Sequence, residues 1–171
     1  MADAKYCFIY HLDVYQGKNK ANIDIDSVPH RLPTMQKTAA NVILKSKITN
    51  DKDGSHHIYM DNKYAAPQLF ALMLTDYNIR GVGICKANRI GFDSDAIQIS
   101  KSCSRGTFER KLDHRLIMVI TRWKDNKILQ TVNTVIKSGI GEVTRRMGSK
   151  IITVPCPKSK IYGWSRSWRL I

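Results

Sequence analysis

The stretch that decides the fold is residues 56–85, which run HHIYMDNKYAAPQLFALMLTDYNIRGVGIC. Residues 56–60 are of types that strands favour, and they predict a short buried strand that ends at Asp61. Apolar side chains then recur at helical spacing up to Tyr77, and residues 80–85 predict a second strand. A strand, a helix and a strand form a βαβ unit, whose two strands should be parallel.

Further elements are expected on the N-terminal side of this unit. Asn62 is the expected N-cap of the helix inside it, and Thr34 that of an earlier helix that reaches about Lys47. Residues 6–15 are rich in aromatic and β-branched types and predict one strand. Residues 18–33 are polar, contain two prolines and predict a loop.

Beyond Ser100 the sequence acquires β character. Residues 107–112, 116–123 and 128–136 predict three strands separated by turn residues, which favours an antiparallel meander. Residues 143–154 are expected to add a fourth edge strand. The whole chain is therefore expected to have an α/β fold with a mostly-β C-terminal part.

The charge of the chain is distributed unevenly. Its 171 residues contain 28 Lys and Arg against 14 Asp and Glu, a net charge of +14. Residues 101–171 hold 16 basic and 4 acidic residues, or +12, and the first hundred hold 12 and 10, or +2. A basic half of this kind suits a polyanion such as nucleic acid. From charge alone, a merely soluble basic surface fits equally well.

Composition excludes several other classes of protein. With 43% hydrophobic residues the chain has enough apolar material for one core. No apolar run approaches the roughly 20 residues of a membrane helix, and the start lacks the order of a signal peptide, so we expect a soluble intracellular protein with no membrane partner. The four cysteines are too far apart for a zinc knuckle or a redox pair and predict small buried thiols. They are Cys7, Cys85, Cys103 and Cys156.

Common nucleotide and metal motifs are also excluded. A dinucleotide fingerprint that begins at Gly81 would need its third glycine where Lys86 stands, and no P-loop pattern occurs. His56 and His57 are adjacent on a strand, so they point to opposite faces and are poorly placed to share a metal.

Asp61 is a candidate functional residue, because α/β sheets carry functional groups at the ends of their strands. One carboxylate cannot hold a pair of magnesium ions, since two-metal phosphoryl transfer needs several converging carboxylates. From the residues alone, Asp61 is either part of a site or a charge favoured by the dipole of the following helix.

Residues 57–70, HIYMDNKYAAPQLF, resemble the second-aspartate segment of piggyBac-type transposases. The resemblance continues in order along the chain through residues 12–18, 81–89, 122–127 and 154–157. It implies a partial RNase H-like core of the DDE/D transposases, a mixed sheet with flanking helices, interrupted by an inserted mostly-β segment.

The resemblance also implies a catalytic site of three aspartates, of which Asp61 matches the second. The first would precede Met1, and Asp3 and Asp13 match neighbouring positions that are not catalytic. The third should follow residue 157, but no carboxylate side chain occurs after Glu142. Asp61 is thus expected to be a vestigial residue of an incomplete Mg²⁺ site, and no cofactor is expected, although the intact family uses Mg²⁺.

Three parts of the chain follow from this comparison. Residues 1–100 form the partial RNase H-like core, residues 101–157 the inserted basic β segment, and residues 158–171 an atypical tail. In the tail, two tryptophans alternate with arginines and would stack on bases if the tail were helical. We favour the alternative of a terminus that packs poorly or stays mobile.

The expected function is that of a catalytically inactive fragment that retains non-specific, phosphate-mediated DNA binding, in the nucleus as the resemblance implies or otherwise in the cytoplasm. The unpaired edge of the strand at residues 6–15 would favour self-association. One alternative is an active transposase or nuclease completed by residues outside this chain. Another is a protein-interaction module, which basic residues scattered around the surface would favour. The candidate DNA contacts are Arg110, Lys111, Arg122, Lys124, Lys127, Arg145, Arg146 and Lys150.

Overall fold

The computed structural model describes residues 32–48, 56–86, 89, 97–135 and 139–158. The strand expected over residues 6–15 lies outside these residues, as does the tail from residue 159 onward. Among the described residues, no helix is both long and apolar enough to cross a membrane.

The expected βαβ unit is present. Strand β1 (His57–Met60) leads through helix α2 (Pro67–Tyr77) to strand β2 (Arg80–Ile84). The two strands are parallel, with Ile58 opposite Gly81. Strand-favouring residue types and the helical spacing between them predict these elements, and both strands lie within one residue of their expected bounds.

Helix α2 begins later than the sequence suggested, so the expected cap at Asn62 is wrong. Residues 62–64 form a turn, in which the carbonyl oxygen of Asp61 accepts hydrogen bonds from the N–H groups of Tyr64 (3.0 Å) and Ala65 (2.9 Å). The helix starts at Pro67, which lacks an N–H and therefore suits the first helical position, where that group has no helical partner.

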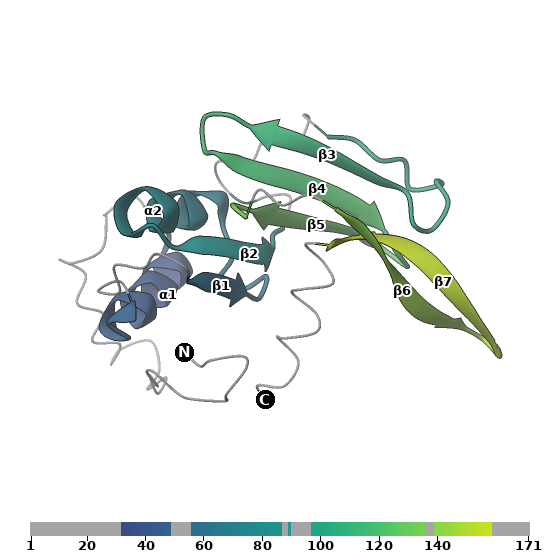
Figure 1. The fold of residues 1–171 in the computed structure, drawn as a ribbon, viewed down its shortest axis with the longest axis horizontal. Coiled ribbons are helices and arrows are strands. Elements are labelled where there is room, and N and C mark those ends of the chain that lie inside the picture. Colours follow the sequence, from purple (N-terminus) through teal and green to yellow (C-terminus); the bar gives the residue numbers. More distant parts are fainter. Residues whose placement is uncertain (1–31, 49–55, 87–88, 90–96, 136–138, 159–171) are drawn as a thin grey trace.

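The expected meander consists of β3 (Phe108–Asp113), β4 (Met118–Lys124) and β5 (Ile128–Asn133), all antiparallel to their neighbours. Strand β5 also pairs antiparallel with β2, which produces one mixed five-stranded sheet in the order β1-β2-β5-β4-β3. The sheet therefore continues across residue 100, where the sequence suggested a domain boundary (Figure 1).

The fourth edge strand expected at residues 143–154 is instead a hairpin. Strands β6 (Ile140–Met147) and β7 (Lys150–Pro157) pair antiparallel in a sheet of their own. Gly148 has a φ of +60° and opens the two-residue loop between them, which is the position where a tight hairpin turn favours glycine.

Helix α1 (Thr34–Lys45) is preceded by Pro33 in the N-cap position, so Thr34 is the first helical residue and not the cap. Its buried side chains include Ala40 and Ile43, which pack in one apolar cluster with Leu69 of α2. Figure 1 shows both helices beside the β1–β2 end of the sheet and the hairpin at the opposite end.

Two more apolar clusters hold the fold together. The ring of Phe70 from α2 packs with Met118 and Val132 of the central strands. Trp123 packs with Val154 and Cys156 of β7, and thereby joins the hairpin to the five-stranded sheet.

Candidate nucleic-acid interface and the Asp61 turn

Five of the eight basic residues expected to contact DNA are exposed. Two lie on the edge strand β3, one in the loop between β4 and β5, and two at the far end of the hairpin. The guanidinium of Arg110 lies over the Phe108 ring, 5.3 Å from its centroid. None of the five side chains forms an ion pair with the described residues. They are Arg110, Lys111, Lys127, Arg146 and Lys150.

Arg122 and Arg145 occupy internal positions instead. The Nε of Arg122 donates to Oε1 of Gln130 at 2.9 Å, and its other end reaches the carbonyl oxygen of Ile97. The Nε of Arg145 lies 3.0 Å from a carboxylate oxygen of Asp125. The sequence did not reveal these partners, because each pair is brought together by strand packing.

Lys124 is intermediate between the two groups. Its side chain is half-buried, and its ammonium donates a 2.8 Å hydrogen bond to the carbonyl oxygen of Lys101. A contact between this ammonium and a DNA phosphate would have to share or replace that bond.

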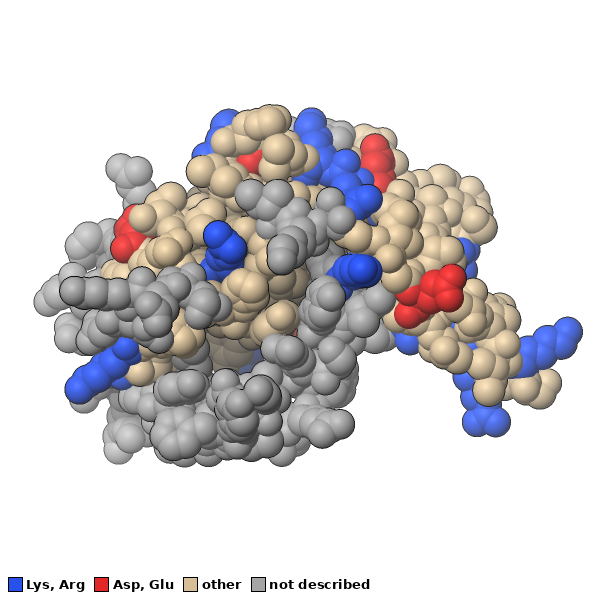
Figure 2. Space-filling view, viewed as in Figure 1, with Lys and Arg blue, Asp and Glu red and all other residues tan. Residues whose placement is uncertain are grey.

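The exposed cations do not form one continuous patch. Arg110 and Lys111 are neighbours on a strand and so project to opposite faces of the sheet. Figure 2 shows basic side chains over the upper part of the sheet and others at the far end of the hairpin, with acidic side chains between them.

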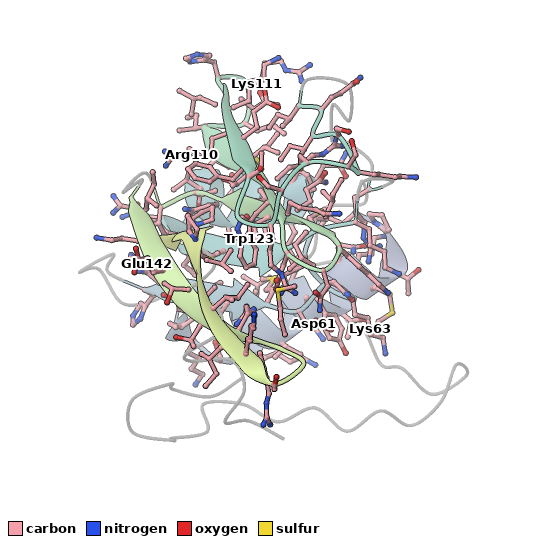
Figure 3. The ribbon with its side chains drawn as sticks, turned by 90° about the vertical axis from the view of Figure 1, so that its right-hand side faces the viewer. Asp61, Lys63, Arg110, Lys111, Trp123 and Glu142 are labelled. Atoms are coloured by element: carbon pink, nitrogen blue, oxygen red, sulfur yellow. The ribbon has the colours of Figure 1, made fainter. Side chains whose placement is uncertain are left out.

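Asp61 lies at the other edge of the described sheet. It follows β1, whereas Arg110 and Lys111 belong to β3, and four strand spacings, or about 19 Å, separate these two strands. Figure 3 shows this separation and places Lys63 beside Asp61. The Asp61 side chain is exposed.

The turn that carries Asp61 is held by Arg89. One terminal nitrogen of the guanidinium donates to the carbonyl oxygens of both Asn62 and Lys63, at 2.9 Å each. The thiol of Cys85 lies 3.7 Å from the carbonyl oxygen of Ala65, at the end of the same turn. Sequence reasoning assigned no role to Arg89, since nothing in its spacing reveals a contact 26 residues back along the chain.

The residues around Asp61 do not fit a magnesium pair. Across the described ranges, no group of three or more His, Cys, Asp or Glu side chains converges at a distance suitable for a metal. Two-metal sites need several carboxylates, whereas the residue labelled beside Asp61 in Figure 3 is a lysine, Lys63.

Comparison with known proteins identifies the family. The family model described as Transposase IS4 matches residues 1–162. The chain belongs to the IS4 transposase family. No curated protein matches this IS4-family chain.

A solved structure shares the fold of this IS4-family chain. It is the cryo-EM structure of piggyBac transposase in a synaptic complex with hairpin DNA, with a TM-score of 0.56 and 16% identity. The match covers 82% of this chain and 26% of the other, so the chain spans about a quarter of that transposase. The expected relation to piggyBac-type transposases and the mixed α/β, RNase H-like fold class are both confirmed.

Proposed function

We propose that these 171 residues bind DNA through phosphate contacts without strong sequence preference, and that they do not by themselves cut or join DNA strands. The observation that carries the proposal is the set of five exposed cations, on a chain whose net charge is +14. The piggyBac transposase that shares the fold was solved with hairpin DNA, which supports the same class of partner.

Catalytic inactivity is inferred from the carboxylates. Asp61 is the one aspartate that matches the family pattern, and the described residues hold no group of three or more His, Cys, Asp or Glu side chains suited to a metal ion. Contacts to phosphates orient a protein on DNA without reading its bases. The proposed DNA binding uses such contacts, so it does not require a metal site at Asp61.

A salt titration of DNA binding tests the proposal. Fluorescence anisotropy with a duplex should show affinity that falls with salt, and each phosphate contact should add about 0.9 to the slope of log affinity against log salt. Lys111→Ala and Lys127→Ala should each lower the slope by about that amount. Lys45→Ala, at an exposed lysine of α1, is the matched control and should not change it.

Two results would overturn DNA binding as proposed. One is the absence of binding by the unaltered chain at low salt. The other is an equal loss of slope in Lys45→Ala and Lys127→Ala, because the cations of β3 to β7 would then have no special part in it.

Incubation with transposon-end DNA and Mg²⁺ or Mn²⁺ tests the inactivity. We expect no cleaved or joined product. Product that disappears in Asp61→Asn would contradict the proposal and support the alternative of an active transposase or nuclease.

One observation favours a second candidate, a protein-interaction module. On the face drawn in Figure 2, the basic side chains lie in separate groups with acidic side chains between them. If low-salt titrations show no DNA binding, this candidate replaces the first.

Nuclear localisation and self-association belong to the same proposal. A DNA-bound role in a nucleated cell implies a nuclear protein, which imaging of a tagged chain would test.

In the described sheet, β1 and β3 are the edge strands, and four of the six residues of β3 are exposed. Unpaired edges promote association, so sedimentation should show a concentration-dependent increase in mass.

A further inference from the structure

The far end of the β6–β7 hairpin extends beyond the part that is attached to the sheet. Val154 and Cys156 pack against Trp123, and Arg145 pairs with Asp125. Beyond these contacts, the four strand residues 146, 147, 150 and 151 are all exposed. Figure 1 shows this end projecting away from the five-stranded sheet.

The register places similar pairs of side chains on both faces of this end. Arg146 is opposite Ile151, and Met147 is opposite Lys150. Because successive residues of a strand point to opposite faces, each face carries one basic and one apolar side chain. The two apolar side chains are largely in solvent and do not cover the core: Ile151 is 72% exposed and Met147 is 53% exposed.

The charge of this end is of one sign. Residues 144–153 contain Arg145, Arg146 and Lys150 and no Asp or Glu, and of these Arg145 is the one paired with Asp125. A narrow, exposed ribbon that combines positive charge with apolar side chains complements a groove with negatively charged walls and a partly apolar floor.

We propose that the end of this hairpin enters the major groove of DNA, an inference that rests on the DNA binding proposed above and assigns it a docking element. The major groove, about 12 Å wide and about 8.5 Å deep, admits a two-stranded ribbon. The free part is two residue pairs long, or about 7 Å, and the two-residue loop extends it further toward the floor. Arg146 and Lys150, on opposite faces, contact the phosphates of the two walls, and Ile151 contacts base edges such as thymine methyl groups.

Disulfide crosslinking tests the groove directly. In Ser149→Cys, the new thiol lies in the loop at the tip, while Cys85 and Cys156 are buried and the unaltered chain serves as the background control. Duplexes carry a thiol tether either on cytosine N4, in the major groove, or on guanine N2, in the minor groove. We expect at least tenfold more adduct with the major-groove tether. Equal adduct with both tethers, or none above background while anisotropy shows bound DNA, overturns the inference.

A pair of isoleucine variants tests the apolar contact. Ile151→Ser should lower DNA affinity about fivefold, because burial of an apolar side chain against the bases is lost. Ile140→Ser is the matched control: Ile140 is 55% exposed but lies at the other end of β6, and its variant should bind normally. Circular dichroism checks that both variants fold.

The outcomes separate the two proposals. If the unaltered chain binds no DNA at any salt concentration, the proposed function fails and this inference fails with it. If the chain binds DNA but Ile151→Ser and Ile140→Ser bind equally well, the hairpin inference alone is wrong and the contacts lie on the sheet.

Discussion

The indole N–H of Trp123 donates a 2.8 Å hydrogen bond to the carbonyl oxygen of Pro155, and this bond joins the five-stranded sheet to the hairpin. The Trp123 side chain is fully buried. The guanidinium of Arg145 lies over the indole, with its Cζ atom 5.8 Å from the ring centroid. The hairpin is therefore held at its base by a polar and an apolar contact of the same side chain.

Trp123→Phe should lower the free energy of unfolding by about 2 kcal/mol. The substitution keeps an aromatic ring but removes the donor, which leaves the Pro155 carbonyl unsatisfied. Urea unfolding followed by far-UV circular dichroism measures the change. An unchanged midpoint would show that the hydrogen bond contributes nothing to the junction.

Asp125→Asn should also destabilise the junction, by about 2 kcal/mol. The nearly buried Asp125 carboxylate lies 2.8 Å from Arg105 and 3.0 Å from Arg145, and its loss leaves two half-buried cations without their counter-charge. Arg115→Ala is the control, since it removes a partner of Asp113 that is 76% exposed and should cost less than about 1 kcal/mol. Equal losses in the two variants would contradict the special role of Asp125.

Local sequence was enough to predict the βαβ unit and the meander, because strand-favouring residue types, helical spacing of apolar side chains and intervening turn residues mark their elements. The hairpin was missed because residues 143–154 are mostly β-prone, and the turn at Gly148 and Ser149 interrupts them for only two residues. The division of the candidate DNA contacts was not predictable either. Whether Arg122 and Arg145 face solvent depends on Gln130 and Asp125, which tertiary pairing brings to them.

Gly81→Ala should destabilise the packing of α2 on β2 by about 3 kcal/mol. An added Cβ would lie 2.2 Å from Cδ1 of the buried Phe70 ring, so the ring or the helix must move. Phe70→Leu in the same chain should relieve part of the clash. We expect the double variant to lose at least about 1 kcal/mol less than the sum of the two single losses in urea unfolding. Additive losses would show that the helix, and not the ring, gives way.

Protonation of the Asp113 carboxylate should make the fold less stable in acid. Burial raises the pKa of this carboxyl, but the hydrogen bonds and the charge of Arg115 lower it more, and the net pKa is below the usual value. A carboxyl with a depressed folded-state pKa stabilises the protein above its unfolded pKa, and this stability is lost as pH falls through the folded value. The free energy of unfolding should therefore decrease below about pH 4. Asp113→Asn should show a smaller decrease, and an identical pH profile would contradict the prediction.

Cys85 should be nearly inert toward alkylating reagents. Burial raises the pKa of its thiol to about 11, and the charge of Arg89 only partly offsets this effect. The thiolate is the nucleophile, and at pH 8 a pKa of about 11 in place of 9.0 lowers the fraction of Cys85 present as thiolate about a hundredfold. Burial further restricts access of the reagent.

Cys103 is partly exposed and serves as the internal standard. Peptide mass spectrometry after iodoacetamide treatment should show Cys85 modified at least a hundred times more slowly than Cys103 in the folded chain, with the difference lost in guanidinium. Comparable rates in the folded chain would mean that the turn after Asp61, against which Cys85 packs, opens readily to solvent.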